Sequence, residues 1–269
     1  MESIRMLGCG HAMVTHCYNT CFLLKNDDAS VLVDCGGGNG LLTQMEKLGE
    51  NWTAIKAVFI SHAHTDHLTG ALWLVRAVCG RIRKGEMDGL FIYASEECLR
   101  ILRVMCEGML SSLSKPFCFD EYRIRLIEID DGSSFDAAGF HFSVFDIASI
   151  HKKQLGFRAQ CPSGKEVVFT GDEKLHKEVY AHAKGADYLM HEAMFAMPRP
   201  VSPGRGPVHH GSAFEAGEIA AALGCRNLII YHTSDDDMAN RKQEYSQSAA
   251  ASFHGNIYVP DDLETITIQ

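Results

Sequence analysis

Four side chains of types that bind metal ions fall within six consecutive positions of the segment SHAHTDHLTG, residues 61–70. They are His62, His64, Asp66 and His67. Imidazole and carboxylate ligands without a thiolate suit zinc, manganese or iron in a site that stays open for catalysis, whereas structural zinc sites usually contain cysteine. On a tight loop, His62 and His64 could bind one cation while Asp66 and His67 bind a second. The segment therefore indicates a catalytic centre with two metal ions.

The residues on either side of this segment favour a functional loop over a chance cluster in a chain with fourteen histidines. Residues 54–60 (AIKAVFI) are apolar and rich in β-branched side chains, which predicts a buried strand. Residues 68–78 (LTGALWLVRAV) have the pattern of an amphipathic helix. A polar loop between the end of a strand and a helix is where α/β folds place their functional groups.

Polar side chains also follow five other apolar runs. They are Asp34, His151, Asp172, the pair His191–Glu192, and His232. Any one of them alone could be a helix cap or a satisfied buried group, but five together with the histidine cluster indicate one site. Asp172 could bridge two cations because a carboxylate has two oxygens. Two cations about 3.5–4 Å apart clamp the attacking and leaving oxygens of a displacement at phosphorus.

The elements that must position these residues alternate between β-rich and helical patterns. The first half is rich in strands and hairpins, and the later half alternates strand and helix. This order predicts two sheets flanked by helices rather than one doubly wound sheet. We expect one α/β domain, of the four-layer α+β type, over residues 1–269. The predicted helices cover residues 41–49, 68–78, 96–110, 174–184, 214–224 and 240–253.

Composition limits the class of protein. The 269 residues are 46% hydrophobic and 22% charged, which allows a sizeable core and argues against disorder. The net charge of −9 disfavours a surface built to wrap nucleic acid. The first residues have no signal-peptide pattern, and no apolar run approaches the ~18 residues that span a membrane. With ten cysteines and no CxxC pair, reduced thiols in a cytoplasmic protein without membrane contact are expected.

The pattern HxHxDH after a strand, a distant histidine, a Gly-Asp pair and a late histidine resembles the metallo-β-lactamase fold superfamily over nearly the whole chain. The resemblance implies an αββα sandwich with the site along one edge. It implies two divalent cations, with zinc expected and manganese or iron as alternatives. Asp34 resembles a buried aspartate that braces the histidine loop without binding metal. The implied first ligand set is His62, His64, His151 and Asp172, and the second is Asp66, His67, Asp172 and His232.

Two further motifs, HEAMF (191–195) and HGSAFEAGEIA (210–220), resemble those of ribonuclease Z. The resemblance implies a dinuclear phosphodiesterase, with endoribonuclease activity and a homodimer as expectations. A hydroxide between the cations would attack phosphorus, and Asp66 would orient it. Glu192 and His210 would pass a proton to the leaving oxygen, with His209 as the alternative to His210.

One departure concerns the exosite arm that ribonuclease Z carries before the Gly-Asp motif. His151 and Asp172 are only 21 positions apart here, which predicts a hairpin with no room for an arm. We therefore expect the substrate to be a phosphodiester. RNA is one candidate, but the missing arm favours a small phosphodiester. Residues 197–208 hold four of the seven prolines and predict either a lid or an ordered surface crossover.

Two other activities of the same fold stay open on the sequence. The first is hydrolysis of an ester or thioester, as in relatives of glyoxalase II. The second is a di-iron oxidoreductase, which is less favoured because position 64 is histidine where flavodiiron proteins carry a glutamate ligand.

Overall fold

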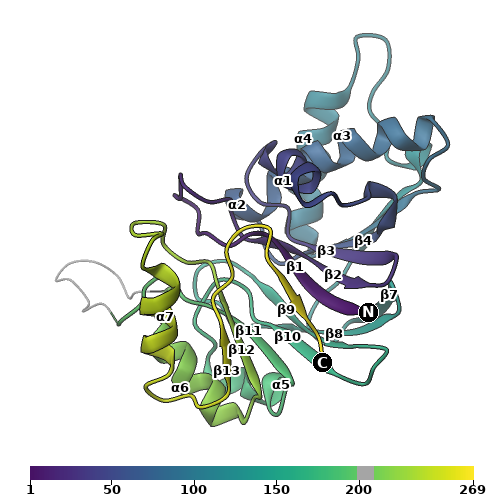
Figure 1. Cartoon of the computed structure of the whole chain (residues 1–269). Helices are drawn as coiled ribbons and strands as arrows, with labels where there is room; N and C mark the ends of the chain where they lie inside the picture. Colours follow the sequence, from purple (N-terminus) through teal and green to yellow (C-terminus); the bar gives the residue numbers. More distant parts are fainter. Residues whose placement is uncertain (199–208) are drawn as a thin grey trace.

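Two mixed β-sheets pack face to face in the computed structural model, which describes residues 1–198 and 209–269 (Figure 1). Within these residues each sheet has seven strands. The first sheet has the order β14-β1-β2-β3-β4-β5-β6, and β3 to β6 run parallel to one another. Its strands are β1 (Glu2–Gly8), β2 (Cys21–Asn26), β3 (Ala29–Val33), β4 (Ile55–Ile60), β5 (Leu90–Ala94), β6 (Ile124–Glu128) and β14 (Thr265–Thr267).

The second sheet has the order β13-β12-β11-β10-β9-β8-β7, and β10 to β13 are parallel. Its strands are β7 (Ser134–Ala137), β8 (Phe140–Asp146), β9 (Leu155–Gln160), β10 (Glu166–Phe169), β11 (Tyr188–Glu192), β12 (Asn227–Tyr231) and β13 (Asn256–Tyr258). The antiparallel pair β9–β10 fills the interval before Asp172. The predicted hairpin without an arm is therefore confirmed.

Helices cover the outer face of each sheet, so the predicted αββα sandwich is confirmed (Figure 1). The first sheet carries α1 (Gly40–Leu48), α2 (Thr65–Leu68), α3 (Gly70–Arg83) and α4 (Glu96–Leu110), with the short turns η1 (Trp52–Ala54) and η2 (Asp120–Tyr122). The second carries η3 (Lys177–Val179), α5 (Tyr180–Ala183), α6 (Ala213–Leu223) and α7 (Arg241–Ala249). Among the described residues, no helix combines the length and hydrophobicity needed to cross a bilayer.

Three apolar layers hold the four layers of backbone together. In β3, Val31 and Val33 point into the core between the sheets, whereas Leu32 points into the core under the helices. This alternation follows from the two-residue period of a strand. It explains why a central strand that is buried on both faces has apolar residues at successive positions of the sequence. Between the sheets, the rings of Phe59 and Phe157 meet edge to face with centroids 5.1 Å apart.

The helix predicted over residues 174–184 is wrong in its first half. Only the 3₁₀ turn η3 and the single turn α5 form there. The reason lies in tertiary hydrogen bonds near the site, which hold the preceding residues in an open loop. The N–H of Lys174 donates to the carbonyl of His209 at 3.4 Å, and the N–H of Leu175 donates to Nε2 of His191 at 3.1 Å.

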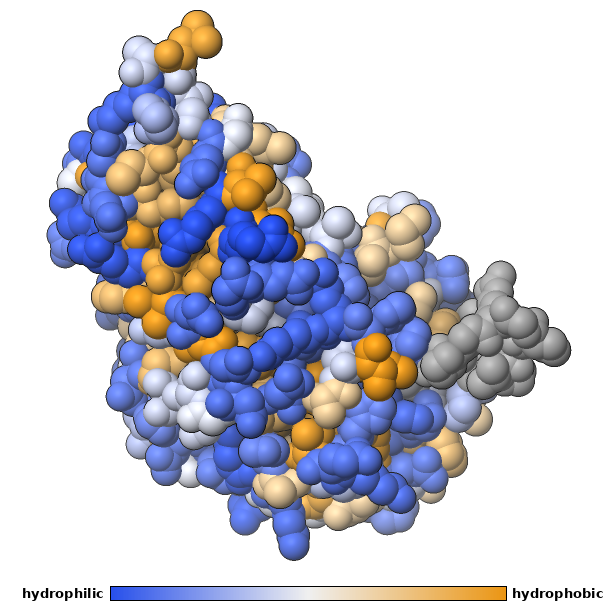
Figure 2. All heavy atoms as spheres, turned by 180° about the vertical axis from the view of Figure 1, so that it is seen from behind, coloured by the Kyte–Doolittle hydropathy of each residue, from blue (hydrophilic) through white to orange (hydrophobic). Residues whose placement is uncertain are grey.

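The surface seen from behind is largely hydrophilic, with apolar patches over the part of the molecule that contains α3 and α4 (Figure 2). Large apolar side chains on α4 and just after it are well exposed: Val104 (62%), Met109 (65%) and Leu113 (fully). The predicted homodimer stays a prediction. The predicted lid covers residues 197–208. Only its first two residues are described, and residues 199–208 lie outside the described part of the chain.

Candidate functional site

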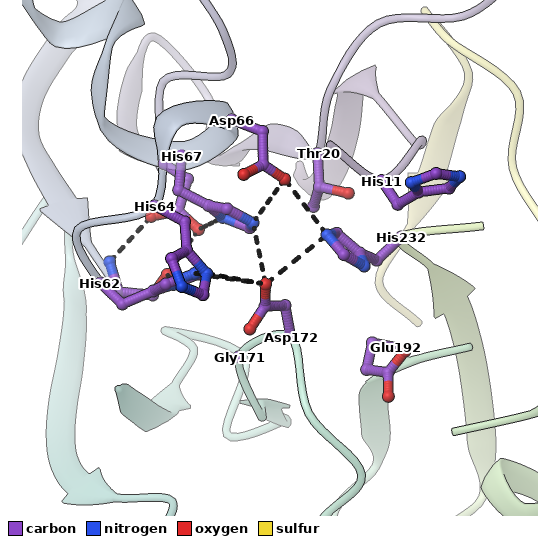
Figure 3. A network of polar contacts seen from close by, with 12 residues as sticks. His11, Thr20, His62, His64, Asp66, His67, Gly171, Asp172, Glu192 and His232 are labelled. Atoms are coloured by element: carbon purple, nitrogen blue, oxygen red, sulfur yellow. Dashed lines mark hydrogen bonds and ion pairs between the residues drawn. The ribbon is translucent and has the colours of Figure 1, made fainter. Parts of the chain in front are cut away.

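The predicted site residues meet where the carboxyl ends of parallel strands from both sheets face each other (Figure 3). Asp34 follows β3, residues 62–67 follow β4, Asp172 follows β10, Glu192 ends β11 and His232 follows β12. Asp34 and His232 have φ angles of 54° and 57°, in the left-handed region that non-glycine residues rarely adopt. Such backbone strain is typical of functional positions.

Asp172 lies at the centre of the cluster and belongs to two groups of potential ligand atoms. His62, His64 and Asp172 form one group, and Asp66, His67, Asp172 and His232 form the other; within each, the ligand atoms lie within 4.8 Å of one another. Oδ2 of Asp172 is 3.2 Å from Nε2 of His62 on one side. On the other side it is 3.5 Å from Nε2 of His67 and 3.6 Å from Nε2 of His232.

The chemistry of this cluster fits divalent cations. Among the residues that the structure describes, Nε2 of His67 has no hydrogen-bond partner; it is buried and lies 3.3 Å from Oδ2 of Asp66. Burial alone would raise the pKa of the Asp66 and Asp172 carboxyl groups, but the neighbouring histidines lower both well below the usual range. Two buried carboxylates and an unpartnered imidazole nitrogen need positive charge, which a metal ion supplies.

Asp34 braces the histidine loop, as the resemblance implied. Its carboxylate accepts hydrogen bonds of 2.7 Å from the N–H and the hydroxyl of Ser61 and from Nδ1 of His67. The Ser61 hydroxyl oxygen in turn lies 2.9 Å from Nδ1 of His62. Because Nδ1 of His62 and Nδ1 of His67 both act as donors, Nε2 of each ring keeps a lone pair that can bind a metal ion. The sequence pattern did not single out Ser61.

His151 is the one predicted ligand that the structure does not bring into either group. It is exposed on the loop between β8 and β9, and its ring lies 4.1 Å from that of His209. It does line the same cavity as His64 and Asp172. Its assignment as a metal ligand stays a prediction.

Glu192 and His210 form a pair beside the cluster. Glu192 is fully buried and accepts hydrogen bonds from the N–H groups of Gly211 (2.5 Å) and Met194 (3.1 Å). Nδ1 of His210 lies 3.7 Å from Oε2 of Glu192. Burial lowers the pKa of His210, but Glu192 outweighs burial and raises it to about 9. Among the described contacts, Glu192 therefore pairs with the imidazole of His210, whereas the ring of His209 lies against that of His151 at an angle of 43°.

Two other side chains of the site were missed by sequence reasoning. Gln154 is fully buried and hydrogen-bonds to Asp172 through both ends of its amide. His11 lines the cavity, and its ring lies 6.2 Å from that of His232 (Figure 3). The only signal for His11 was its place in the opening LGCGHA, and Gln154 stands in no pattern. The cavity that His11 shares with the cluster has a volume of about 490 Å³.

Comparison with known proteins gives one family match and many distant relatives. The model of the family described as "Anti-Pycsar protein Apyc1" matches residues 2–203. A ribonuclease Z from Natronomonas pharaonis is 25% identical over 310 aligned residues, which cover 98% of this chain and 97% of that protein. A ribonuclease Z from Phocaeicola vulgatus is 25% identical over 275 aligned residues, with 86% and 87% covered.

Solved structures share the fold over the full length. The metallo-β-lactamase fold protein YhfI from Bacillus subtilis has a TM-score of 0.79 at 19% identity, covering 98% of both chains. The short form of human tRNase Z has a TM-score of 0.71 at 20% identity, covering 99% of both. A diphosphatase of the PhnP family has a TM-score of 0.75 at 16% identity, covering 100% of this chain and 98% of its own. At these identities the likeness establishes the fold alone.

Proposed function

Because the chain belongs to the family of the anti-Pycsar protein Apyc1 and is a metallo-β-lactamase fold hydrolase related to ribonuclease Z, we propose that it is a dinuclear phosphodiesterase. We propose a small phosphodiester, of the cyclic nucleotide class, as its substrate. The observation that carries the proposal is the position of Asp172, one carboxylate shared by two groups of ligand residues that are all buried except the half-buried His64.

Two divalent cations, zinc first among them, would supply a hydroxide from water at neutral pH and neutralise charge on the phosphoryl oxygens. His62 and His64 would hold one cation, and His67 and His232 the other, with Asp172 between them. Asp66 contacts both His67 and His232 at 3.3 Å and presents a carboxylate that can accept a hydrogen bond from the attacking oxygen and so orient it.

The proton for the leaving oxygen would come from His210. Its ring centroid lies 5.2 Å from that of His232, so it borders the place where phosphorus would lie. The Glu192 carboxylate favours the imidazolium form and is itself held by the N–H groups of Gly211 and Met194. A protonated imidazole held beside the scissile bond is suited to act as a general acid.

The size and charge of the site support a small substrate. A cavity of about 490 Å³ has room for a single nucleotide. The β9–β10 hairpin stands where an exosite arm would bind RNA, and the net charge of −9 opposes contacts with many phosphates. Family membership supports a cyclic nucleotide. RNA is the second candidate, supported by the likeness to ribonuclease Z over 97% of that protein's length.

The test is a substrate comparison on protein loaded with zinc or manganese. The panel holds 3′,5′-cyclic nucleotides of each base, bis(p-nitrophenyl) phosphate, a precursor tRNA, a thioester and a lactam. We expect kcat/KM to be highest for a cyclic nucleotide and activity to vanish on metal removal. Preferential cleavage of precursor tRNA would support the second candidate. A protein that holds two cations but turns over only the thioester or lactam would contradict phosphodiester chemistry altogether.

A further inference from the structure

The two oxygens of Asp172 have different surroundings. Oδ2 faces the histidines, and the distances given above run from 3.2 to 3.6 Å, with Nδ1 of His64 at 3.7 Å. Oδ1 instead accepts a hydrogen bond from the side-chain nitrogen of Gln154. From the sequence we expect Asp172 to bridge two cations because its carboxylate has two oxygens. In the structure these two oxygens are not equivalent.

Gln154 is built to hold this arrangement. Its side chain is fully buried, and its carbonyl oxygen Oε1 accepts the backbone N–H of Asp172 at 3.0 Å. Because only Oε1 can accept that N–H, Nε2 must face the carboxylate, and the orientation of the amide is fixed by its partners. Gln154 thus contacts Asp172 at two points, one on the backbone and one on the side chain.

The backbone around Gln154 and Asp172 is also fixed. The carbonyl of Gln154 accepts the N–H of Ile147 at 3.1 Å, and the next N–H, of Leu155, donates to the carbonyl of Ser61 at 3.0 Å. The second bond ties this segment to the start of the histidine loop. Gly171 has a φ of +72°, and a Cβ there would lie 2.7 Å from Oε1 of Gln154. The amide therefore occupies space that glycine at 171 leaves open.

We propose that Gln154 is a positioning residue that engages Oδ1 of Asp172, so that Oδ2 alone would be presented to the two cations. A carboxylate that bridges through both oxygens spans a wider metal–metal distance than one that bridges through a single atom. By engaging Oδ1, Gln154 would favour a site in which two cations lie close enough to act on one phosphoryl group, about 3.5–4 Å apart. The inference rests on the proposed dinuclear site but needs no particular substrate.

The test is the binding of Mn²⁺ to the metal-stripped full-length protein and to three variants. Gln154→Leu removes both hydrogen bonds at similar volume, and Gln154→Glu keeps the shape and the acceptor but loses the donor. Gln160→Leu makes the same change at an exposed position of the same strand, β9, and is the matched control. Thermal melting without metal shows whether each variant folds. If the leucine variant does not fold, the glutamate variant, which keeps the acceptor for the N–H of Asp172, carries the test.

We expect the affinity for the weaker-bound Mn²⁺, measured against a chelating dye, to fall about 10–100-fold in both position-154 variants and not in the control. The electron paramagnetic resonance spectrum of the two-manganese form should also change, because exchange coupling between the ions depends on the bridging atoms. The inference is overturned if both affinities stay within about threefold of wild type with an unchanged spectrum, or if the wild-type protein saturates at one Mn²⁺. Neither readout involves turnover. A protein that binds Mn²⁺ as expected but cleaves no phosphodiester would refute the proposed function and leave the role of Gln154 standing.

Discussion

Replacing Glu192 by glutamine should impair catalysis in a way that depends on pH. With Glu192 ionised, the pKa of His210 is raised to about 9. Without that charge, burial lowers the pKa and only Asp172 still raises it, so the pKa falls from about 9 toward the ordinary value of 6.5. If it reaches 6.5, the protonated fraction of His210 at pH 7.5 drops from about 97% to about 9%. If the imidazolium donates the proton, the rate should fall by the same factor, up to about tenfold.

The ratio of variant to wild-type activity should therefore vary with pH. By the same arithmetic the loss is about 75-fold at pH 8.5 and nearly absent at pH 5.5. Bound cations would lower the pKa of His210 in both proteins, which moves the window to lower pH but keeps its direction. His210→Ala has no group to protonate, so its loss should be large at every pH, within the ~10²–10⁴ range of general acid catalysis.

The assay compares two diesters at each pH. One has an alkoxide leaving group, with a pKa near ~15, and needs the proton; the other releases p-nitrophenolate, with a pKa near ~7, and hardly does. Both variants should lose activity on the first and keep most of it on the second. The double variant should be little worse than His210→Ala, because groups that act as a unit are not additive. Glu218→Gln, an exposed position on α6, is the control.

Two outcomes would refute the reasoning. One is a ratio for Glu192→Gln that does not change with pH, or an equal loss on both diesters. The other is loss of a cation from His210→Ala, since Glu192, His210 and His232 also lie close enough to hold one. Glutamine at 192 would place an amide N–H opposite a backbone N–H, at a cost of about 1–3 kcal/mol, so melting temperatures must accompany the rates.

Three other changes have expected results. His67→Ala should reduce the metal content from two ions to one by elemental analysis, whereas His141→Ala, at an exposed position, should not. Two ions in both variants would show that His67 does not hold a second cation. Chelation should lower the melting temperature by roughly 5–10 °C, since a ligand at 100 times its Kd adds about 2.7 kcal/mol; an unchanged melting curve would show that no cation is bound in the fold. Precursor tRNA should bind weakly at physiological salt, because few cationic side chains can contact phosphates; nanomolar affinity would contradict the argument from the missing arm.

The sequence predicted the parts of the site that depend on local order. HAHTDH contains four ligand-type residues in one loop, and apolar runs that end in Asp34, Asp172 and His232 identify strands whose carboxyl ends carry polar groups. In a layered fold these ends meet at one edge, so clustering followed from the pattern. The predicted helix at 96–110 coincides with α4 because its apolar period and its Ser95 cap agree.

The parts that failed depend on contacts between distant segments. Gln154 faces Asp172 only because β9 and β10 pair as a hairpin, and a lone glutamine has no periodicity that marks it. The position of His151 depends on a loop whose ring contact is with His209, 58 residues later (209 − 151). Residues 174–184 have a helical period, but hydrogen bonds to His191 and His209 hold their start open. Tertiary structure overrides local propensity at these places.

The arrangement of the two sheets has a consequence for biosynthesis. The ligand atoms come from residues 62–67 in the first sheet and from Asp172 and His232 in the second. The first sheet itself is completed by β14, which pairs with β1, the first strand of the chain. A chain still on the ribosome therefore lacks Asp172, which both groups need, until that residue has emerged, and its second group stays incomplete until residue 232 has emerged. Cation uptake is then a late event, and the cation, once bound, joins two halves of the polypeptide that were made at different times.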